Sequence, residues 1–327
     1  MLHEVEAKGN KSFDVKLNEN KGGFCPFLSV ESTEGVRKIP IFSIRNPKHR
    51  APIARSIVSG HVGVLEAGVM GVLIAVPNNP SVDNYVGKKF WEVKRGRGSS
   101  DKVPVMMLPE NHDEIVDYSK IHPDFAYLKY PEKRHEFFGK YPFHTILPVL
   151  SDVILNRDVF VTTPEDSQKK PQDQWVSEPT VCIFFPGGDG AWENVAKIAR
   201  DINPDVHLGV SSLNDHGEQP PYNLDQLVSF INRKQRVDFD FIIQDPISRA
   251  AQIKSSHTQI RLPFKSEAPE IIIIRDGSVS PGKISEHTGH PVKILESVRF
   301  ASHGHPENIR LKGLDDRINQ YLKEANS

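Results

Sequence analysis

The sequence has very little cysteine and no long hydrophobic run. Cys25 and Cys182 are its only cysteines, which excludes a disulfide framework and a zinc ribbon and fits a reducing compartment. No apolar run approaches the roughly 20 residues that a bilayer-spanning helix needs, so no membrane partner is expected. The first 20 residues carry several acids and no apolar segment typical of a signal or transit peptide. Together these absences predict a cytoplasmic protein.

An excess of charge of either sign is also absent. The 327 residues include 41 Lys and Arg against 42 Asp and Glu, a formal net charge of −1. Bulk electrostatics therefore give no general attraction to nucleic acid, and any such contact must come from a local patch. With 38% hydrophobic and 25% charged residues, the composition is that of a globular protein of one large or two modest domains.

Several common catalytic and binding motifs are missing. The glycine-rich stretch 186–190 lacks the lysine and spacing of a Walker A loop and does not match a dinucleotide fingerprint, which favours a plain turn. No Gly-x-Ser-x-Gly elbow is present. The histidines are not spaced as metal ligands, and His303 and His305 fit a surface loop. From the residues alone we assign no metal site and no catalytic residue.

Strand-like and helix-like segments are mixed along the chain, with many strands for each helix. This pattern predicts an α/β fold, a twisted open mixed sheet with helices packed on it. Residues 53–65, 192–202 and a segment beginning at Asn223 are expected to be helical. Short apolar runs predict the strands, at 71–76, 103–108, 145–150, 159–162, 180–185, 206–210, 239–244, 258–262, 271–274 and 292–295.

We expect three regions along the chain. Residues 1–50 are polar and broken, and they are expected to form an N-terminal extension whose apolar pieces, 24–30 and 39–44, are edge strands. Residues 51–286 carry the alternating pattern and form the main α/β domain. Residues 287–327 form a C-terminal extension that ends in an amphipathic helix.

A basic, glycine-bearing stretch follows residue 87. Arg95 and Arg97 are separated by Gly96, so their side chains point the same way if the segment is extended. Two guanidiniums on one face suit a polyphosphate, because each planar fork pairs with two oxygens. The alternative is a solvated loop, which is the more frequent role of a charge run.

A second polar group follows the strand expected at 206–210. Ser212 and Asn214 place a hydroxyl and an amide at the carboxyl end of that strand, where ligands often bind. The same residues also suit a simple turn.

The order of these pieces resembles the YrdC-like family of threonylcarbamoyl-AMP synthases. A strand that ends at Pro77, a helix and Arg95-Gly96-Arg97 correspond in order to the family's turn, helix and Lys-x-Arg motif. Five later segments continue the resemblance over roughly 55–285. They are 141–145 for Trp-Pro-Gly-Pro-x-Thr, 181–186 for the strand ending in Arg-x-Pro, 212–214 for Ser-x-Asn, 257–258 for Ser-Thr and 275–277 for Arg-x-Gly.

The resemblance implies both a fold and a reaction. The fold is a twisted open sheet with a large, positively charged cavity. In the reaction, threonine, bicarbonate and ATP give threonylcarbamoyl-AMP and pyrophosphate, and the product modifies an adenosine of tRNA. ATP and Mg²⁺ are the cofactors implied, with Mg²⁺ on the phosphates.

The resemblance also implies roles for individual residues. Arg95 and Arg97 would hold phosphates, and Ser212 and Asn214 would bind nucleotide and carbamate. The nucleotide- and phosphate-binding set is completed by Thr258 and Arg275. Pro77, Asn78 and Asn79 would form the turn that recognises the substrate.

Three positions depart from the family pattern. The substrate turn reads Pro77-Asn78-Asn79-Pro80, so the family's threonine hydroxyls are missing. The first basic residue is Arg95 and not lysine. Phe184 stands where the family has arginine, and phenylalanine cannot pair with a carboxylate or phosphate. These changes affect the active site more than the scaffold.

Three hypotheses follow. The first is a divergent nucleotidyltransferase that forms a carbamoyl- or threonylcarbamoyl-adenylate linked to tRNA modification. The second is a catalytically degenerate module on the same fold that binds nucleotide or RNA, either tRNA or double-stranded RNA. The third is a scaffold whose terminal extensions carry the function. The sequence does not predict an oligomeric state.

Overall fold

The structure is a computed structural model that describes residues 14–18, 25–32, 35–67, 69–78, 105–139, 144–152, 155–165, 177–185, 190–214, 220–234, 237–245, 257–277 and 279–300. Its strands are β1 (Asp14–Asn18), β2 (Phe27–Ser32), β3 (Gly35–Ser43), β4 (Gly63–Ala67), β5 (Val69–Pro77), β6 (Met106–Leu108), β7 (His144–Pro148), β8 (Val161–Thr162), β9 (Thr180–Phe184), β10 (Val206–Ser212), β11 (Phe241–Gln244), β12 (Gln259–Arg261), β13 (Ile271–Asp276) and β14 (Val292–Phe300). Its helices are α1 (Pro47–Val58), α3 (Glu114–Tyr118), the 3₁₀-helix η2 (Pro123–Lys129), α4 (Pro131–Gly139), α5 (Arg157–Phe160), α7 (Ala191–Ile202), α8 (Leu224–Lys234) and α10 (Pro281–Thr288). None of these described helices has the length and apolar character needed to cross a bilayer.

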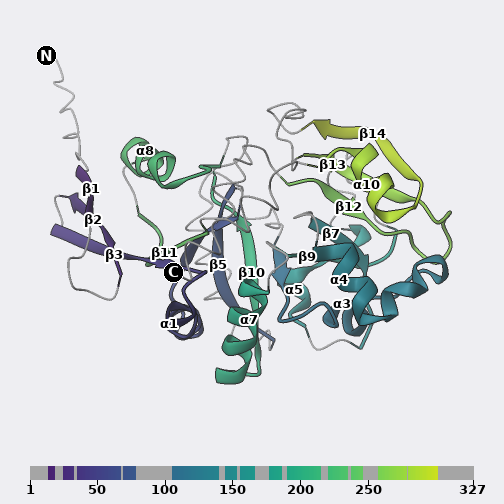
Figure 1. Ribbon diagram of the computed structural model, residues 1–327, viewed down its shortest axis with the longest axis horizontal. Coiled ribbons are helices and arrows are strands. Elements are labelled where there is room, and N and C mark those ends of the chain that lie inside the picture. Colours follow the sequence, from purple (N-terminus) through teal and green to yellow (C-terminus); the bar gives the residue numbers. More distant parts are fainter. Residues whose placement is uncertain are drawn as a thin grey trace, which may run out of the picture.

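The strands form one mixed sheet in the order β1-β2-β3-β11-β4-β5-β10-β6-β9-β7-β12-β13-β14, with β8 beside β9. The hairpin of β1 and β2 lies at one end, and β13, β14 and α10 lie at the other (Figure 1). Central strands such as β5 are almost continuously apolar because both faces of the sheet are covered. The predicted α/β fold with a mixed sheet and packed helices is confirmed.

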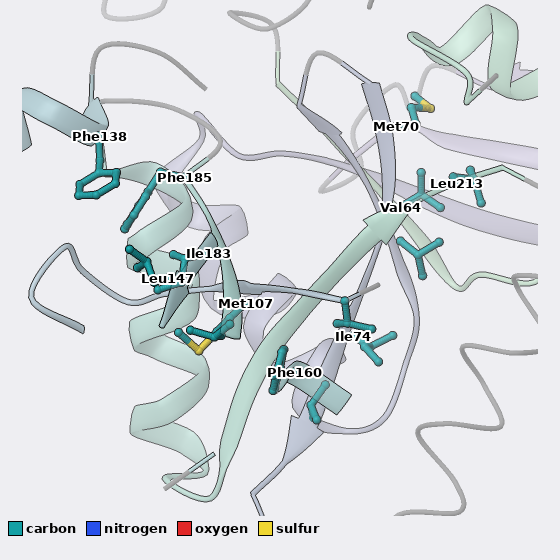
Figure 2. Packing of buried hydrophobic residues seen from close by; sticks show 14 of the residues in the cluster. Val64, Met70, Ile74, Met107, Phe138, Leu147, Phe160, Ile183, Phe185 and Leu213 are labelled. Carbon is teal, nitrogen blue, oxygen red and sulfur yellow. The ribbon is translucent and has the colours of Figure 1, made fainter. Parts of the chain in front are cut away.

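Two hydrophobic clusters cover opposite faces of the sheet. On one face, Ile53 and Ile57 of α1 pack with Trp192 and Val195 of α7 against β4, β5 and β11. The other cluster includes residues of α3, α4 and α8. Figure 2 shows part of it, where Phe138 of α4 and Phe185 lie side by side with ring centroids 5.5 Å apart. Burial of these side chains is the main stabilising contribution to the fold.

Strand β5 determines which loops share an edge of the sheet. It runs antiparallel to both β4 and β10. At one end Gly71 is the partner of Leu65 on β4 and of Ser212 on β10, and at the other end Pro77 is the partner of Val206. The start of β5 and the ends of β4 and β10 therefore share one edge.

Two segments differ from their predicted structure. The helix expected at 53–65 begins earlier, because the Asn46 side chain accepts from the Lys48 amide and caps α1. The chain leaves the helix at Gly60, whose φ of 86° suits glycine, and then enters β4. Residues 159–162, expected to be a strand, are divided between α5 and β8, because Asn156 caps a short helix there.

The terminal segments join the sheet. Strand β2 lies between β1 and β3, and β3 lies between β2 and β11, so both are interior strands, although residues 24–30 and 39–44 are expected from the sequence at an edge. Strand β14 pairs with β13 in parallel. The expected terminal helix lies beyond residue 300, outside the described residues. The boundaries at 50 and 286 remain predictions.

Candidate functional site

Ser212 and Asn214 lie where β10 ends. The Ser212 hydroxyl donates to Oδ1 of Asn214 over 2.6 Å, which orients the amide. The backbone amide of Leu213 donates to the carbonyl of Met70 over 2.9 Å. The predicted pair is therefore held against the start of β5.

The turn between β4 and β5 lies at the same edge. Ala67 and Val69 are register partners at the open end of the β4–β5 pair. The carbonyl of Ala67 is hydrogen-bonded to Nε2 of His257, which is buried. His257 therefore links the end of β4 to the loop that precedes β12.

Strands β7, β9, β12 and β13 bring further candidate residues together. His144 begins β7, and its register partners are Phe184 on β9 and Gln259 on β12. The imidazole of His144 lies edge-on to the Phe184 ring, with centroids 4.7 Å apart, and 5.2 Å from the ring of His257. Arg275, near the end of β13, is also paired with Gln259.

Arg275 organises this group. Its Nε and Nη2 donate to the carbonyl of His257 over 3.0 and 2.8 Å. Nη2 also lies 3.2 Å from Nδ1 of His144. Three residues that lie far apart in the sequence, which we call the Arg275 cluster, are thus joined: His144 on β7, His257 just before β12 and Arg275 on β13.

The Arg275 cluster carries one uncompensated positive charge. Among the residues that the structure describes, no carboxylate forms an ion pair with Arg275, and burial lowers its pKa. Burial and the neighbouring Arg275 hold the pKa of His144 well below its usual value, so this imidazole is neutral at pH 7. A buried cation without a counterion is costly, and an anion that reaches it gains strong charge-assisted hydrogen bonds.

Thr258 is hydrogen-bonded to the protein next to the Arg275 cluster and stabilises it. Its hydroxyl donates to the carbonyl of Val279 over 2.7 Å and accepts from the amide of the same residue over 2.8 Å. Its own carbonyl accepts from the amide of His144. The predicted ligand-binding hydroxyl is therefore engaged within the protein.

The residues predicted for the substrate turn lie elsewhere. Pro77 ends β5 at the end opposite Ser212, and Asn78 Oδ1 lies 2.6 Å from Nδ1 of His207. The structure therefore does not bring these two residues to Ser212 and Asn214. Arg95, Arg97 and Asn79 lie outside the described residues.

Sequence reasoning overlooked His144 and the β4–β5 turn. His144 stands inside the segment 141–145 that carried part of the resemblance, but it was not chosen as a site residue. A histidine at the first position of a buried strand was the available signal. The end of β4 carries a polar residue, Glu66, which directly precedes Ala67 and is only 1% exposed.

The residues described offer no metal site. No group of three or more His, Cys, Asp or Glu side chains among them could hold a metal ion. We therefore assign no protein ligand for Mg²⁺ among the described residues.

Comparison with solved structures identifies the fold. The chain matches a doubly substituted Sua5 from P. abyssi with a TM-score of 0.50 and 15% identity, covering 79% of this chain and 62% of that one. The chain thus spans less than two thirds of the length of that protein. It also matches YciO from E. coli (TM-score 0.46, 14% identity, 73% of this chain and 96% of that chain). HypF from T. kodakarensis matches with a TM-score of 0.43 and 12% identity, over 68% of this chain and 24% of that one.

No protein-family model and no curated protein matches the chain. The Sua5 match shows that the chain has a YrdC-like fold.

Proposed function

We propose that this is a cytoplasmic nucleotide-binding protein that binds ATP at the shared edge of β4, β10 and the Arg275 cluster, and that it forms a carbamoyl- or threonylcarbamoyl-adenylate for tRNA modification. The observation that carries the proposal is the guanidinium of Arg275, which lies beside the neutral His144 and has no carboxylate partner among the described residues. Such a group suits the phosphate of a nucleotide. The YrdC-like fold is consistent with this ligand.

Hydrogen bonds and strand pairing connect the parts of this site. His257 joins Arg275 to Ala67, and Ala67 pairs with Val69 at the start of β5. The next residue, Met70, accepts from Leu213, which lies between Ser212 and Asn214. The two groups of polar side chains are therefore linked through the β4–β5 turn.

Each residue has a proposed role. Arg275 binds a phosphate, and Ser212 and Asn214 bind the nucleotide and the acyl oxygens. Arg95 and Arg97 contact the remaining phosphates. Mg²⁺ would arrive on the phosphates of ATP, and no step is assigned to it.

A second candidate function is nucleotide or RNA binding without chemistry. Phe184 favours it, because this phenylalanine occupies the place of a family arginine and packs against His144 and His257. A site with one fewer cation stabilises less of the charge that develops in adenylyl transfer.

The test of the proposal is ATP binding by the full-length protein and by Arg275→Met. We expect the substitution to weaken binding about tenfold or more, since a hydrogen bond to a charged group contributes about 1.5–3 kcal/mol. Arg275→Lys, which keeps the charge, should retain part of the affinity, and Arg55→Met on exposed α1 surface is the matched control. Equal affinities of wild type and Arg275→Met would refute the assigned site.

The two candidate functions differ in turnover. Incubation with ATP, bicarbonate and a panel of amino acids should release pyrophosphate if the protein is an enzyme. ATP binding without pyrophosphate release from any mixture would leave the binding module as the function.

A further inference from the structure

The tautomer of His144 follows from its contact with Arg275. A guanidinium has only donors, so Nη2 of Arg275 requires an unprotonated Nδ1 at 3.2 Å. Since the ring is neutral, its single N–H proton is on Nε2. Arg275 therefore fixes His144 as a donor at its far nitrogen.

That donor has no acceptor within the protein. Nε2 of His144 is shielded from solvent and has no hydrogen-bond partner in the part of the chain that the structure describes, and the residue is only 5% exposed. An unpaired buried N–H group loses its hydrogen bonds to water without replacement, so such groups are rare in folded proteins. The placement therefore suggests that the missing acceptor belongs to a ligand.

The surroundings limit what this ligand group is. The positive charge of Arg275 lies on the other side of the His144 ring, which disfavours a cation. An N–H group binds only an acceptor, and an oxygen with negative charge makes the stronger bond. The nearby ring of Phe184 adds no competing charge.

The geometry points to His144 as a ligand-binding residue whose Nε2–H donates to an anionic oxygen of the molecule bound by Arg275. This inference deepens the proposed function, because it concerns the same ligand. The Arg275 side chain is of intermediate exposure, whereas Nε2 of His144 is shielded. Binding at Nε2 therefore requires a side-chain rearrangement around the ring, a type of change that is common at binding sites.

Two sources of an anionic oxygen are consistent with this site, a phosphoryl group and an acyl group carried by the adenylate. Binding measurements with AMP, ATP and adenosine separate them. AMP differs from adenosine only by a phosphoryl group. If substitution of His144 weakens the binding of AMP and ATP but not of adenosine, the Nε2–H group donates to a phosphate oxygen. If the substitution weakens binding only in mixtures of ATP with bicarbonate and amino acid, the Nε2–H group donates to the acyl oxygen.

Three variants test the role of the donor. His144→Phe removes it and keeps a ring, whereas His144→Gln places an amide N–H near the position of Nε2. We expect His144→Phe to weaken binding of the anionic ligand about tenfold or more and His144→Gln to retain binding within about threefold. Exposed His61→Phe is the matched control and should bind as the wild type does.

The comparison with Arg275→Met separates the two proposals. If Arg275→Met weakens ATP binding and His144→Phe does not affect any of the mixtures, the role of His144 is wrong and the proposed function stands. If the wild type binds neither ATP nor AMP, the proposed function is wrong, and this inference fails with it. Equal weakening of adenosine binding by His144→Phe would also overturn the inference, because adenosine has no anionic oxygen.

The tautomer has its own measurement, which needs no ligand. Nitrogen-15 NMR of the imidazoles at pH 7 should show His144 protonated at Nε2 and not at Nδ1. Addition of ATP should then shift the Nε2–H resonance in the wild type. Protonation at Nδ1 would overturn the assignment.

Discussion

Nδ1 of His207 lies 2.6 Å from the amide oxygen of Asn78, which ties the end of β5 to β10 inside the protein. The other ring nitrogen, Nε2, lies 2.8 Å from the hydroxyl of Tyr118, which in turn lies 2.9 Å from Oε1 of Glu114. Arg200 of α7 pairs with the same carboxyl group. These residues form a buried polar network at the edge of the sheet opposite Ser212, and the network indicates a structural role for Asn78.

Tyr118 is the central hydroxyl of this network. We expect Tyr118→Phe to lower the free energy of unfolding by about 1–3 kcal/mol, because it leaves the buried Nε2 of His207 without a partner and removes one hydrogen bond to Glu114. Urea unfolding monitored by circular dichroism measures the difference. Tyr130→Phe is the matched control, since that side chain is 60% exposed, and should change stability by less than about 0.5 kcal/mol. Equal effects of the two substitutions would contradict the network.

Glu193, in the first turn of α7, gives a pH-dependent prediction. Burial raises the pKa of its carboxyl to about 7, from an ordinary value of 4.5. The folded state therefore holds the proton more tightly, and this contribution to stability is present below pH 4.5 and lost as pH rises through 7. Glu193→Gln stays neutral, so its stability relative to wild type should rise between pH 4.5 and pH 8 by about 1–3 kcal/mol.

Unfolding midpoints at pH 4.5, 6 and 8 measure this trend. Glu132→Gln, on the exposed surface of α4, is the control and should show no comparable trend. A Glu193→Gln difference that is constant with pH would show that the carboxyl is not buried as described.

Two glycines provide a test of the side-chain packing. A Cβ on Gly63 of β4 would lie 2.6 Å from the buried ring of Phe241, whereas one on Gly282 of α10 would meet nothing within 4 Å. We expect Gly63→Ala to cost about 1–3 kcal/mol through overpacking. Gly282→Ala should be neutral or stabilising by up to about 1 kcal/mol, because alanine favours the helix. Thermal unfolding of both variants measures their stability relative to the wild type. A Gly63→Ala variant as stable as the wild type would contradict the close contact with Phe241.

Helices and strands were predicted well where the pattern that defines them lies within a few neighbouring residues. The apolar run of β5, the helical spacing of Trp192, Val195 and Ala199 in α7, and the Asn223 cap of α8 all depend on neighbours a few residues apart. The Asn223 side chain accepts from the Gln226 amide, as a helix start requires. Ile202 was expected on the same buried face but is 45% exposed, because it is the last residue of α7.

Placement of the site depended on long-range pairing, which a single sequence does not show. The antiparallel register of β5 and β10 separates Pro77 from Ser212, although both follow apolar strands. The contact between Arg275 and His144 joins positions 131 residues apart, and no short motif encodes it. The resemblance to a known family predicted the fold, because the order of many weak segments reflects the whole topology.

Strand β11 sets a limit on how this chain assembles during synthesis. It lies between β3 and β4 and pairs with both in parallel, yet it is encoded about two hundred residues after them. The N-terminal strands therefore leave the ribosome without their central neighbour, and the gap closes only when residues 241–244 emerge. Formation of such distant pairs is slow, and the unfilled strand edges are exposed to aggregation in the meantime. Nascent chains that stop short of β11 should consequently depend on chaperones to remain unaggregated.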